Sequence, residues 1–250
     1  MERQELNTAF AMEGQLLKRK LFTERPNFHG RATIPQNWQL PDDVLQWLDM
    51  HVQRGQRTLE TGCGYSTVLF ALKRARHTVI SPAVEEHERI RGWCEANEID
   101  VSNLDFKLAR SEELLLVTEP EPLDLVLIDG WHAFPAPIVD WFFTAKRLVV
   151  NGYVIVNDTH HKAVRILRDF LEMERGRWEL VARFKRTDIF QKVSPNVFIG
   201  EWYTQPYCAK DRLRILMRTK FVAVVKLFPP LYRACKAVRN RMLGNNRELK

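Results

Sequence analysis

Short apolar runs alternate with helical patterns through most of the chain, and this alternation constrains the fold more than any other feature. Two runs, LDLVLID at 123–129 and GYVIVND at 152–158, are almost continuously apolar. Such runs are typical of central parallel strands, which are buried on both faces. Segments with apolar residues at helical spacing lie between the runs. The pattern predicts an α/β protein with a doubly wound, mostly parallel sheet and helices on both faces.

The predicted order is βα repeated five times, followed by two strands joined by a long connection without a helix. The first predicted strand ends at Leu59–Glu60, and the others cover 77–81, 104–109, 123–129, 152–158, 178–184 and 196–202. The predicted helices begin at Pro41, at 66, 83 and 111, at 135 (ending at 148) and at 163. The closing pair of strands predicts an antiparallel strand near one edge of the sheet.

The charge is divided unevenly along the chain. Residues 211–250 hold 11 of the 38 basic residues and 2 of the 31 acidic ones, so the basicity behind the net charge of +7 belongs to the tail. We therefore divide the chain into a helical lead-in (1–35), a main domain (36–205) and a basic amphipathic helical tail (206–250). The tail either packs on the domain or on a second copy of the chain, or lies on an anionic membrane surface. It lacks interleaved aromatic residues, so nucleic acid is the least favoured partner.

The four cysteines lie far apart and form no C-x-x-C pair, which indicates neither a zinc site nor a disulfide framework. The segment MERQELNTAF lacks the apolar core of a signal peptide, and no segment has the roughly 20 apolar residues that cross a bilayer. We expect a cytoplasmic protein, with the tail as the part that would contact the inner face of the membrane.

The stretch TLETGCGYSTVLFAL, 58–72, leads from the first strand through a glycine turn into a helix. Glycine lets a ligand approach the backbone, and the helix amino terminus offers free N–H groups. A dinucleotide fingerprint would place a third glycine at position 67, where this chain has Thr67. Glu60, directly before the turn, would repel a phosphate and suits a ligand with an ammonium group.

On these residues the chain resembles the class I S-adenosylmethionine-dependent methyltransferases, whose first strand is followed by an acid, any residue and G-x-G. The motifs LETGCGYST, LIDGWHAFP and VNDT resemble the bacterial methyltransferase family 24 group. The resemblance covers about residues 40–202 and implies a seven-stranded sheet with one reversed strand. It implies that Glu60 holds the methionine amine and that Ser81 stands where an acid usually binds the ribose. The implied cofactor-binding residues are Glu60, Thr61, Gly62, Cys63, Gly64, Ser66, Thr67, Ser81, Ser111 and Asp129.

Acidic residues and histidines follow the fourth and fifth predicted strands. The candidate catalytic residues are Asp129, His132, Asp158 and His160, with His161 beside them. In one mechanism, His132 or Asp158 is the general base that takes a proton from a substrate hydroxyl. In the other, Asp129, Asn157 and Asp158 bind a divalent cation. Metal-dependent catechol-type relatives have Asp-Asn after the fifth strand, and this chain has Asn-Asp, so we favour a metal-free site.

The sequence thus predicts methyl transfer from S-adenosylmethionine to an oxygen of a small molecule or of a glycan or lipid-linked intermediate. No N-P-P-Y-type signature of amino-group methylation follows the fourth strand. One alternative is a methyltransferase fold without catalysis, acting as a binding protein in a membrane-associated complex. Another is an NAD-dependent oxidoreductase, which Thr67 disfavours.

Overall fold

A computed structural model describes residues 14–30, 39–117, 121–197 and 204–209. The chain divides into two compact units, Met1–Val197 and Phe198–Lys250. In the second unit the described part is the short helix α8 (Pro206–Ala209). The rest of the predicted basic tail, 210–250, lies outside the described residues, so its helical character and its partners stay predictions.

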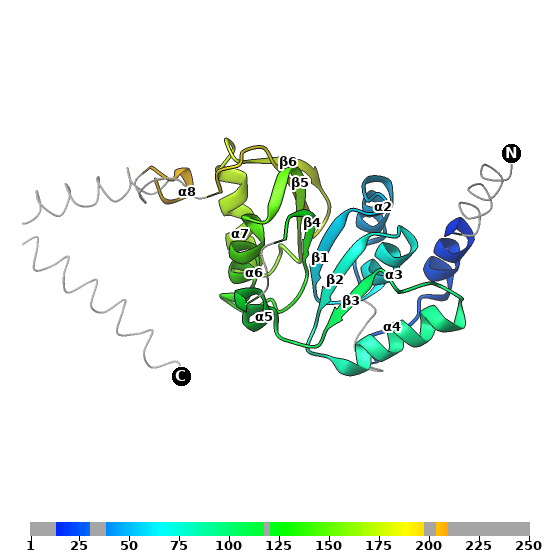
Figure 1. The fold of residues 1–250 in the computed structure, drawn as a ribbon. Helices are drawn as coiled ribbons and strands as arrows, with labels where there is room; N and C mark the ends of the chain where they lie inside the picture. The colour runs from blue at the N-terminus through cyan, green and yellow to red at the C-terminus, as the bar shows by residue number, and fades with distance from the viewer. Residues whose placement is uncertain (1–13, 31–38, 118–120, 198–203, 210–250) are drawn as a thin grey trace, which may run out of the picture. The chain divides into compact units, whose positions relative to one another are not determined.

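The first unit is built on a seven-stranded sheet in the order β3-β2-β1-β4-β5-β7-β6 (Figure 1). Strands β1 to β5 are parallel, while β7 is antiparallel to both of its neighbours. This confirms the predicted fold class, with its one antiparallel strand next to the sheet edge. The strands are β1 (Arg57–Thr61), β2 (Arg76–Ile80), β3 (Leu104–Lys107), β4 (Leu123–Ile128), β5 (Leu148–Asn157), β6 (Trp178–Arg183) and β7 (Thr187–Lys192).

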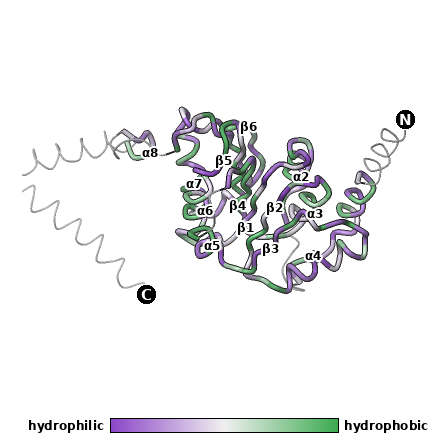
Figure 2. Tube along the Cα trace, viewed as in Figure 1, coloured by the Kyte–Doolittle hydropathy of each residue, from purple (hydrophilic) through white to green (hydrophobic). Residues whose placement is uncertain are grey.

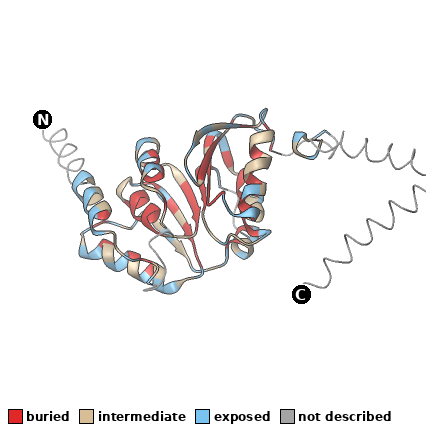
Figure 3. Ribbon diagram, turned by 180° about the vertical axis from the view of Figure 1, so that it is seen from behind, coloured by how far each residue is buried: buried red, intermediate tan, exposed pale blue. Residues whose placement is uncertain are grey.

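Two hydrophobic clusters, one on each face of the sheet, hold the helices in place. In β4, Leu125 and Leu127 belong to the first cluster, whereas Val126 and Ile128 belong to the second. Alternate side chains of one strand point to opposite faces, so burial on both faces requires the continuous apolar run. Figure 2 shows the hydrophobic colouring along these strands, and Figure 3 shows that the same strands are buried.

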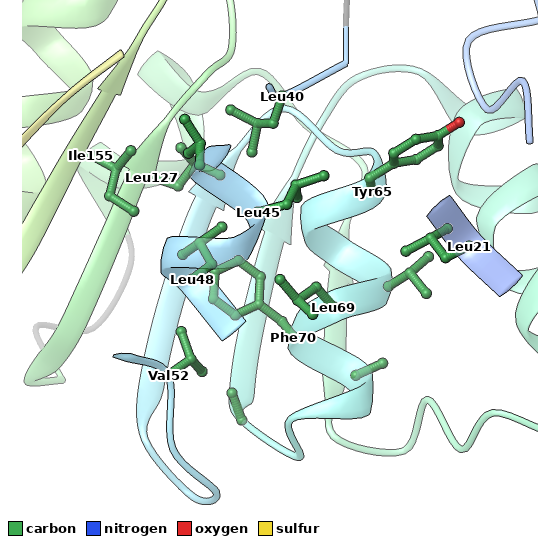
Figure 4. Close-up of a cluster of buried hydrophobic side chains, with 14 of the residues drawn as sticks. Leu21, Leu40, Leu45, Leu48, Val52, Tyr65, Leu69, Phe70, Leu127 and Ile155 are labelled. Atoms are coloured by element: carbon green, nitrogen blue, oxygen red, sulfur yellow. The ribbon is translucent and has the colours of Figure 1, made fainter. Parts of the chain in front are cut away.

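The helices divide between the two clusters. Helices α2 (Asp42–His51), α3 (Tyr65–Leu72) and α4 (Val84–Ala96) contribute to the first, part of which Figure 4 shows. Helices α5 (Ser111–Val117), α6 (Ala136–Ala145) and α7 (Lys162–Met173) contribute to the second. The predicted helices are therefore confirmed, except that the one predicted to end at 148 ends at Ala145. Leu148 instead begins β5, which is longer than the predicted strand at 152–158.

The second strand of the closing pair was predicted in the wrong place. The structure puts β7 at Thr187–Lys192, joined to β6 by a short turn, and not at 196–202 after a long connection. Residues 198–202 of that predicted strand lie outside the described residues. The sequence TDIFQK has a charged residue near each end, yet Asp188 is buried and accepts a hydrogen bond from Arg183 at 2.8 Å. Lys192 is likewise buried, and its ammonium group donates to the Leu148 and Ala145 carbonyls. Because these charges are paired inside the protein, hydropathy alone does not mark the strand.

The described part of the predicted lead-in packs into the main core. Residues 14–24 are helical, and Leu21 and Phe28 belong to the first cluster. The Phe28 ring makes edge-to-face contacts with Tyr65, at 5.6 Å between centroids, and with Trp93, at 6.1 Å. Among the described residues, no helix combines the length and the apolar character needed to cross a membrane.

Candidate functional site

The turn between β1 and α3 lies against the end of β4. Gly62 has a φ of +93°, and its N–H donates to the Ile80 carbonyl at 2.9 Å. A Cβ atom on Gly62 would lie 2.5 Å from the Asp129 carbonyl oxygen, so glycine is required here. The described atom nearest to a Cβ on Gly64 would be His29 Nε2, at 3.8 Å. The turn is therefore tight at Gly62, whereas a Cβ atom at the buried Gly64 would make only an ordinary van der Waals contact with His29.

Glu60 is buried and both of its carboxylate oxygens are engaged by α3. The Ser66 hydroxyl donates to Oε2 at 2.5 Å, and the Thr67 hydroxyl donates to Oε1. His77 Nε2 lies 3.2 Å from Oε1. Thr67 also accepts the Gly64 N–H at 3.0 Å, so it links the acid to the turn. Glu60, Ser66 and Thr67 thus fix the shape of the turn, and the predicted contact of Glu60 with a methionine amine stays a prediction.

Ser81 follows β2 and is buried, with its hydroxyl accepting the Ala83 N–H at 3.3 Å. Cys63, in the middle of the glycine turn, donates instead to Glu86 in the first turn of α4, at 3.2 Å. The pKa of the Cys63 thiol is raised because the group is buried and lies beside Glu86 and Glu60. This thiol is therefore protonated at neutral pH and serves as a hydrogen-bond donor rather than as a nucleophile.

Ser111 and Thr61 lie near a buried acid that the sequence analysis did not single out. Asp140, on α6, is fully buried, and burial raises its pKa to about 6. The Ser111 and Thr61 hydroxyls interact with this carboxyl and oppose that rise. Neither oxygen of Asp140 nor the Thr61 hydroxyl has a hydrogen-bond partner of ordinary geometry among the described residues. Thr61 thus ends β1, and Ser111 begins the helix that follows β3, as predicted. The Asp140 carboxyl, whose oxygens lack ordinary hydrogen-bond partners among the described residues, lies near both.

Asp129 and Asn157 follow and end the neighbouring strands β4 and β5, and the structure brings them together. The Asn157 amide donates to Asp129 Oδ1 at 2.7 Å, and its oxygen accepts the Thr187 hydroxyl at 2.5 Å. Burial raises the pKa of Asp129, although Asn157 and His132 oppose the rise. Both ends of the Asn157 amide are thus engaged, and the residue orients the Asp129 carboxylate in this structure.

His132 lies between two carboxylates. Its Nε2 atom is 3.4 Å from Asp158 Oδ2 and 3.7 Å from Asp129 Oδ1, and it has no hydrogen-bond partner among the described residues. Burial lowers the pKa of His132, but the two neighbouring carboxylates outweigh it, so the pKa is raised above its ordinary value. In its neutral form, an imidazole whose cation is stabilised in this way can accept a proton from a bound hydroxyl.

Asp158 is held in an unusual backbone conformation. Its φ is +56°, a region in which residues other than glycine are uncommon. Arg186, in the β6–β7 turn, places its Nε 3.3 Å from Asp158 Oδ1. The sequence analysis missed Arg186 because the turn was assigned to a long connection. Strained residues of this kind cluster at functional sites, which agrees with the predicted role of Asp158.

The two remaining histidines lie beside this group. His160 Nδ1 is 3.7 Å from Asp158 Oδ1, and the His161 ring stacks on His132 at 5.2 Å between centroids. Across the described ranges, His132, Asp158 and His161 form a group whose potential metal-ligating atoms lie within 4.8 Å of one another. This group differs from the set Asp129, Asn157 and Asp158 that the sequence suggested. The structure thus gathers Asp129, His132, Asp158 and His160 at one place, while their catalytic roles stay predictions.

The position of this group follows from the topology. The chain runs from β1 outward to β2 and β3, then returns to place β4 on the other side of β1. Ligands of open α/β sheets bind at such a reversal, at the carboxyl ends of the strands. Gly62 and Asp129 are in contact across it, with the Asp129 N–H donating to the Thr61 carbonyl at 3.1 Å. The glycine turn and the His132 group therefore lie at the same edge of the sheet, at the carboxyl ends of β1, β4 and β5.

Residues 59–159 match the sequence profile of a methyltransferase domain, that of methyltransferase family 24. No curated protein matches the chain. Among solved structures, the O-methyltransferase TomG of Streptomyces achromogenes, in complex with S-adenosylmethionine, is 18% identical with a TM-score of 0.54 over 69% of this chain and 89% of TomG. A candidate caffeoyl-CoA O-methyltransferase of Staphylococcus aureus is 14% identical, with a TM-score of 0.51 over 76% and 99% of the two chains. A candidate rRNA methylase of Clostridium thermocellum is 12% identical, with a TM-score of 0.52 over 62% and 96%.

These structural likenesses show the fold, and the profile match covers the glycine turn and the ends of β4 and β5. Glu60, the acid directly before the turn, agrees with the expectation of a ligand that carries an ammonium group and not a phosphate. The resemblance noted in the sequence is confirmed: residues 59–159 match a methyltransferase-domain profile, and the first unit has the fold of the class I, S-adenosylmethionine-dependent methyltransferases.

Proposed function

We propose that this protein transfers the methyl group of S-adenosylmethionine to an oxygen atom of a small molecule or of a glycan or lipid-linked intermediate. When bound, S-adenosylmethionine supplies an electrophilic methyl carbon attached to a sulfonium. Gly62, Gly64 and the residues after β2 and β3 would hold it. The observation that carries the proposal is His132, whose Nε2 atom lies between the Asp129 and Asp158 carboxylates.

The arrangement suits a hydroxyl acceptor better than an amine. A hydroxyl is a weak nucleophile until its proton is removed, whereas a neutral amine already carries a free electron pair. His132 would take the hydroxyl proton, and the two carboxylates would stabilise the imidazolium that forms. Asn157 would keep Asp129 oriented, and Arg186 would do the same for Asp158. Each group of the cluster thus has a role in one proton transfer.

Two of the similar structures are named O-methyltransferases, which supports an oxygen acceptor, and one is named an rRNA methylase. The test is to incubate the purified protein with methyl-labelled S-adenosylmethionine and three acceptor pools. These are phenolic and sugar small molecules, a lipid-linked glycan extract, and total RNA. We expect label in methyl ethers from the first or second pool, lost in His132→Ala. Label in RNA or in N-methyl groups would contradict the proposed acceptor. Tight cofactor binding without transfer to any pool would favour a non-catalytic binding protein.

We further propose a cytoplasmic location, with residues 211–250 in contact with the membrane surface. This rests on the charge of the tail, eleven basic residues against two acidic ones. Removing 211–250 should lower binding to vesicles of anionic lipid while methyl transfer persists. Unchanged vesicle binding would refute the membrane contact.

A further inference from the structure

The site lacks an acid where βαβ folds that bind a nucleoside usually have one. In such folds a carboxylate about 20 residues after the glycine turn accepts hydrogen bonds from the ribose hydroxyls. Here β2 ends at Ile80 and is followed by Ser81, whose buried hydroxyl accepts the Ala83 N–H. Serine offers fewer acceptor positions than a carboxylate. The ribose end of a bound nucleoside therefore needs another partner.

Glu86 places a carboxylate against the glycine turn from α4. Its Oε2 accepts the Cys63 thiol at 3.2 Å, and its Oε1 lies 3.0 Å from His29 Nδ1. The Glu86 side chain is partly buried, with 17% of its surface exposed. A carboxylate has about four lone-pair positions, and these two contacts occupy only part of them. Glu86 can therefore accept further hydrogen bonds beside the turn.

His29 comes from a segment far away in the sequence and is held firmly in place. Its neighbour Phe28 is buried against Tyr65, which Figure 4 shows at the start of α3, and Arg89 Nε donates to the Phe28 carbonyl. The His29 ring reaches the turn itself, because its Nε2 atom lies 3.8 Å from the position of a Cβ on Gly64. His29 and Glu86 thus meet over the part of the turn that a ligand would approach.

We propose that Glu86 accepts hydrogen bonds from the ribose hydroxyls of S-adenosylmethionine in place of an acid at position 81, and that His29 positions the Glu86 carboxylate. This rests on the cofactor of the proposed function. Burial would raise the pKa of Glu86, but the contacts with His29 and Cys63 lower it below its ordinary value. At neutral pH the group is therefore ionised and accepts hydrogen bonds without donating any. It favours free hydroxyls and repels a ribose phosphate.

The test measures binding of S-adenosylhomocysteine and of its 2′-deoxy and 3′-deoxy ribose analogues by calorimetry. The proteins are the wild type, Glu86→Gln, His29→Ala and Glu85→Gln, the last being an exposed neighbour that serves as a matched control. We expect the wild type to prefer the full ribose over at least one deoxy analogue by about 10-fold or more. Glu86→Gln should weaken S-adenosylhomocysteine binding by about 10- to 100-fold and reduce that preference to about twofold. Glu85→Gln should match the wild type.

His29→Ala should weaken binding less than Glu86→Gln does, and the preference for the full ribose should fall with it. A merely structural role for either residue would weaken all three ligands equally, which would overturn the proposal. A wild type that does not distinguish the three ligands would also overturn it, and this arm needs no variant to fold. If the wild type binds no S-adenosylhomocysteine at all, the cofactor of the proposed function is wrong, and the proposed ribose contact is wrong with it. Normal binding with an unchanged preference in Glu86→Gln refutes the ribose contact alone.

Discussion

The backbone carbonyl of Asp129 occupies the place that a side chain on Gly62 would need, 2.5 Å from the position of its Cβ. This contact joins the glycine turn after β1 to the His132 group after β4. A change at Gly62 therefore disturbs both parts of the site at once.

Gly62→Ala should destabilise the fold by about 1–3 kcal/mol, because φ is positive and the Asp129 backbone must move. Gly64→Ala should fold normally and still weaken S-adenosylhomocysteine binding, because the added methyl group fills the space over the turn. Melting curves and calorimetry distinguish the two effects. Gly92→Ala is the control: it lies within α4, with nothing within 4 Å of the added Cβ among the described residues. Equal melting temperatures for Gly62→Ala and wild type would show that the turn tolerates a side chain.

His132→Ala should lower kcat by about 10²–10⁴-fold and leave S-adenosylhomocysteine affinity unchanged, because it removes the proton acceptor and not a cofactor contact. His160→Ala should have a smaller effect on kcat, since its ring is 3.7 Å from Asp158 and more exposed than that of His132. The measurement is steady-state kinetics with the acceptor identified in the transfer assay. A His132→Ala enzyme with normal kcat would exclude it as the base.

The rate of methyl transfer should rise with pH as His132 loses its proton. Burial opposes the charged form, but Asp129 and Asp158 raise the pKa of His132 above 6.5, so the rising limb lies above that pH. Asp129→Asn removes one stabilising carboxylate and should shift the limb to lower pH while reducing kcat. A limb that stays in place in Asp129→Asn would show that another group controls it.

Asp140 should make the protein less stable as pH rises from about 4 to about 6. The unfolded chain releases this proton near 3.8, while the folded protein holds it until about 6, so folding becomes less favourable between these values. The difference corresponds to about 3 kcal/mol at neutral pH. Asp140→Asn should remove this loss of stability. Glu95→Gln, an exposed change on α4, should leave it intact. Urea unfolding at pH 4.5 and pH 7.5 measures the effect, and parallel pH dependence in Asp140→Asn and wild type would contradict it.

Treatment with a chelator should leave methyl transfer intact, because the Asn157 amide is already bonded to Asp129 and Thr187. Activity lost to chelation and restored by magnesium would reverse this expectation. Restoration by zinc but not by magnesium would instead point to His132, Asp158 and His161, since imidazole ligands suit zinc better than magnesium.

Much of the fold could be predicted from the sequence, because parallel strands that are buried on both faces require continuous apolar runs. The runs at 123–129 and 152–158 had to be apolar on both faces, and both are central strands. The strand at Thr187–Lys192 has no such run, because Asp188 and Lys192 are buried with partners that only the folded chain supplies. A hydropathy value describes the average behaviour of a residue type. It does not include the ion pairs and hydrogen bonds that one particular side chain makes in the folded protein.

The site was predicted in the same uneven way. Asp129, His132 and Asp158 could be named because each lies within four residues of the end of β4 or β5, and parallel strands end at one edge. His29 and Arg186 could not, since they reach the site from a loop and a turn distant in sequence. Glu86, the acid that contacts the glycine turn, could not be named either. The side of the helix on which its carboxylate lies depends on the residue at which α4 begins.

The place of β7 in the sheet has a consequence for how the protein is made. This strand is the last of the seven to leave the ribosome, yet it lies between β5 and β6. Until it is synthesised, one long edge of β5 has no partner and can pair with another chain. Stalled or truncated products that end before Thr187 should therefore aggregate, even though they contain the complete glycine turn and the His132 cluster.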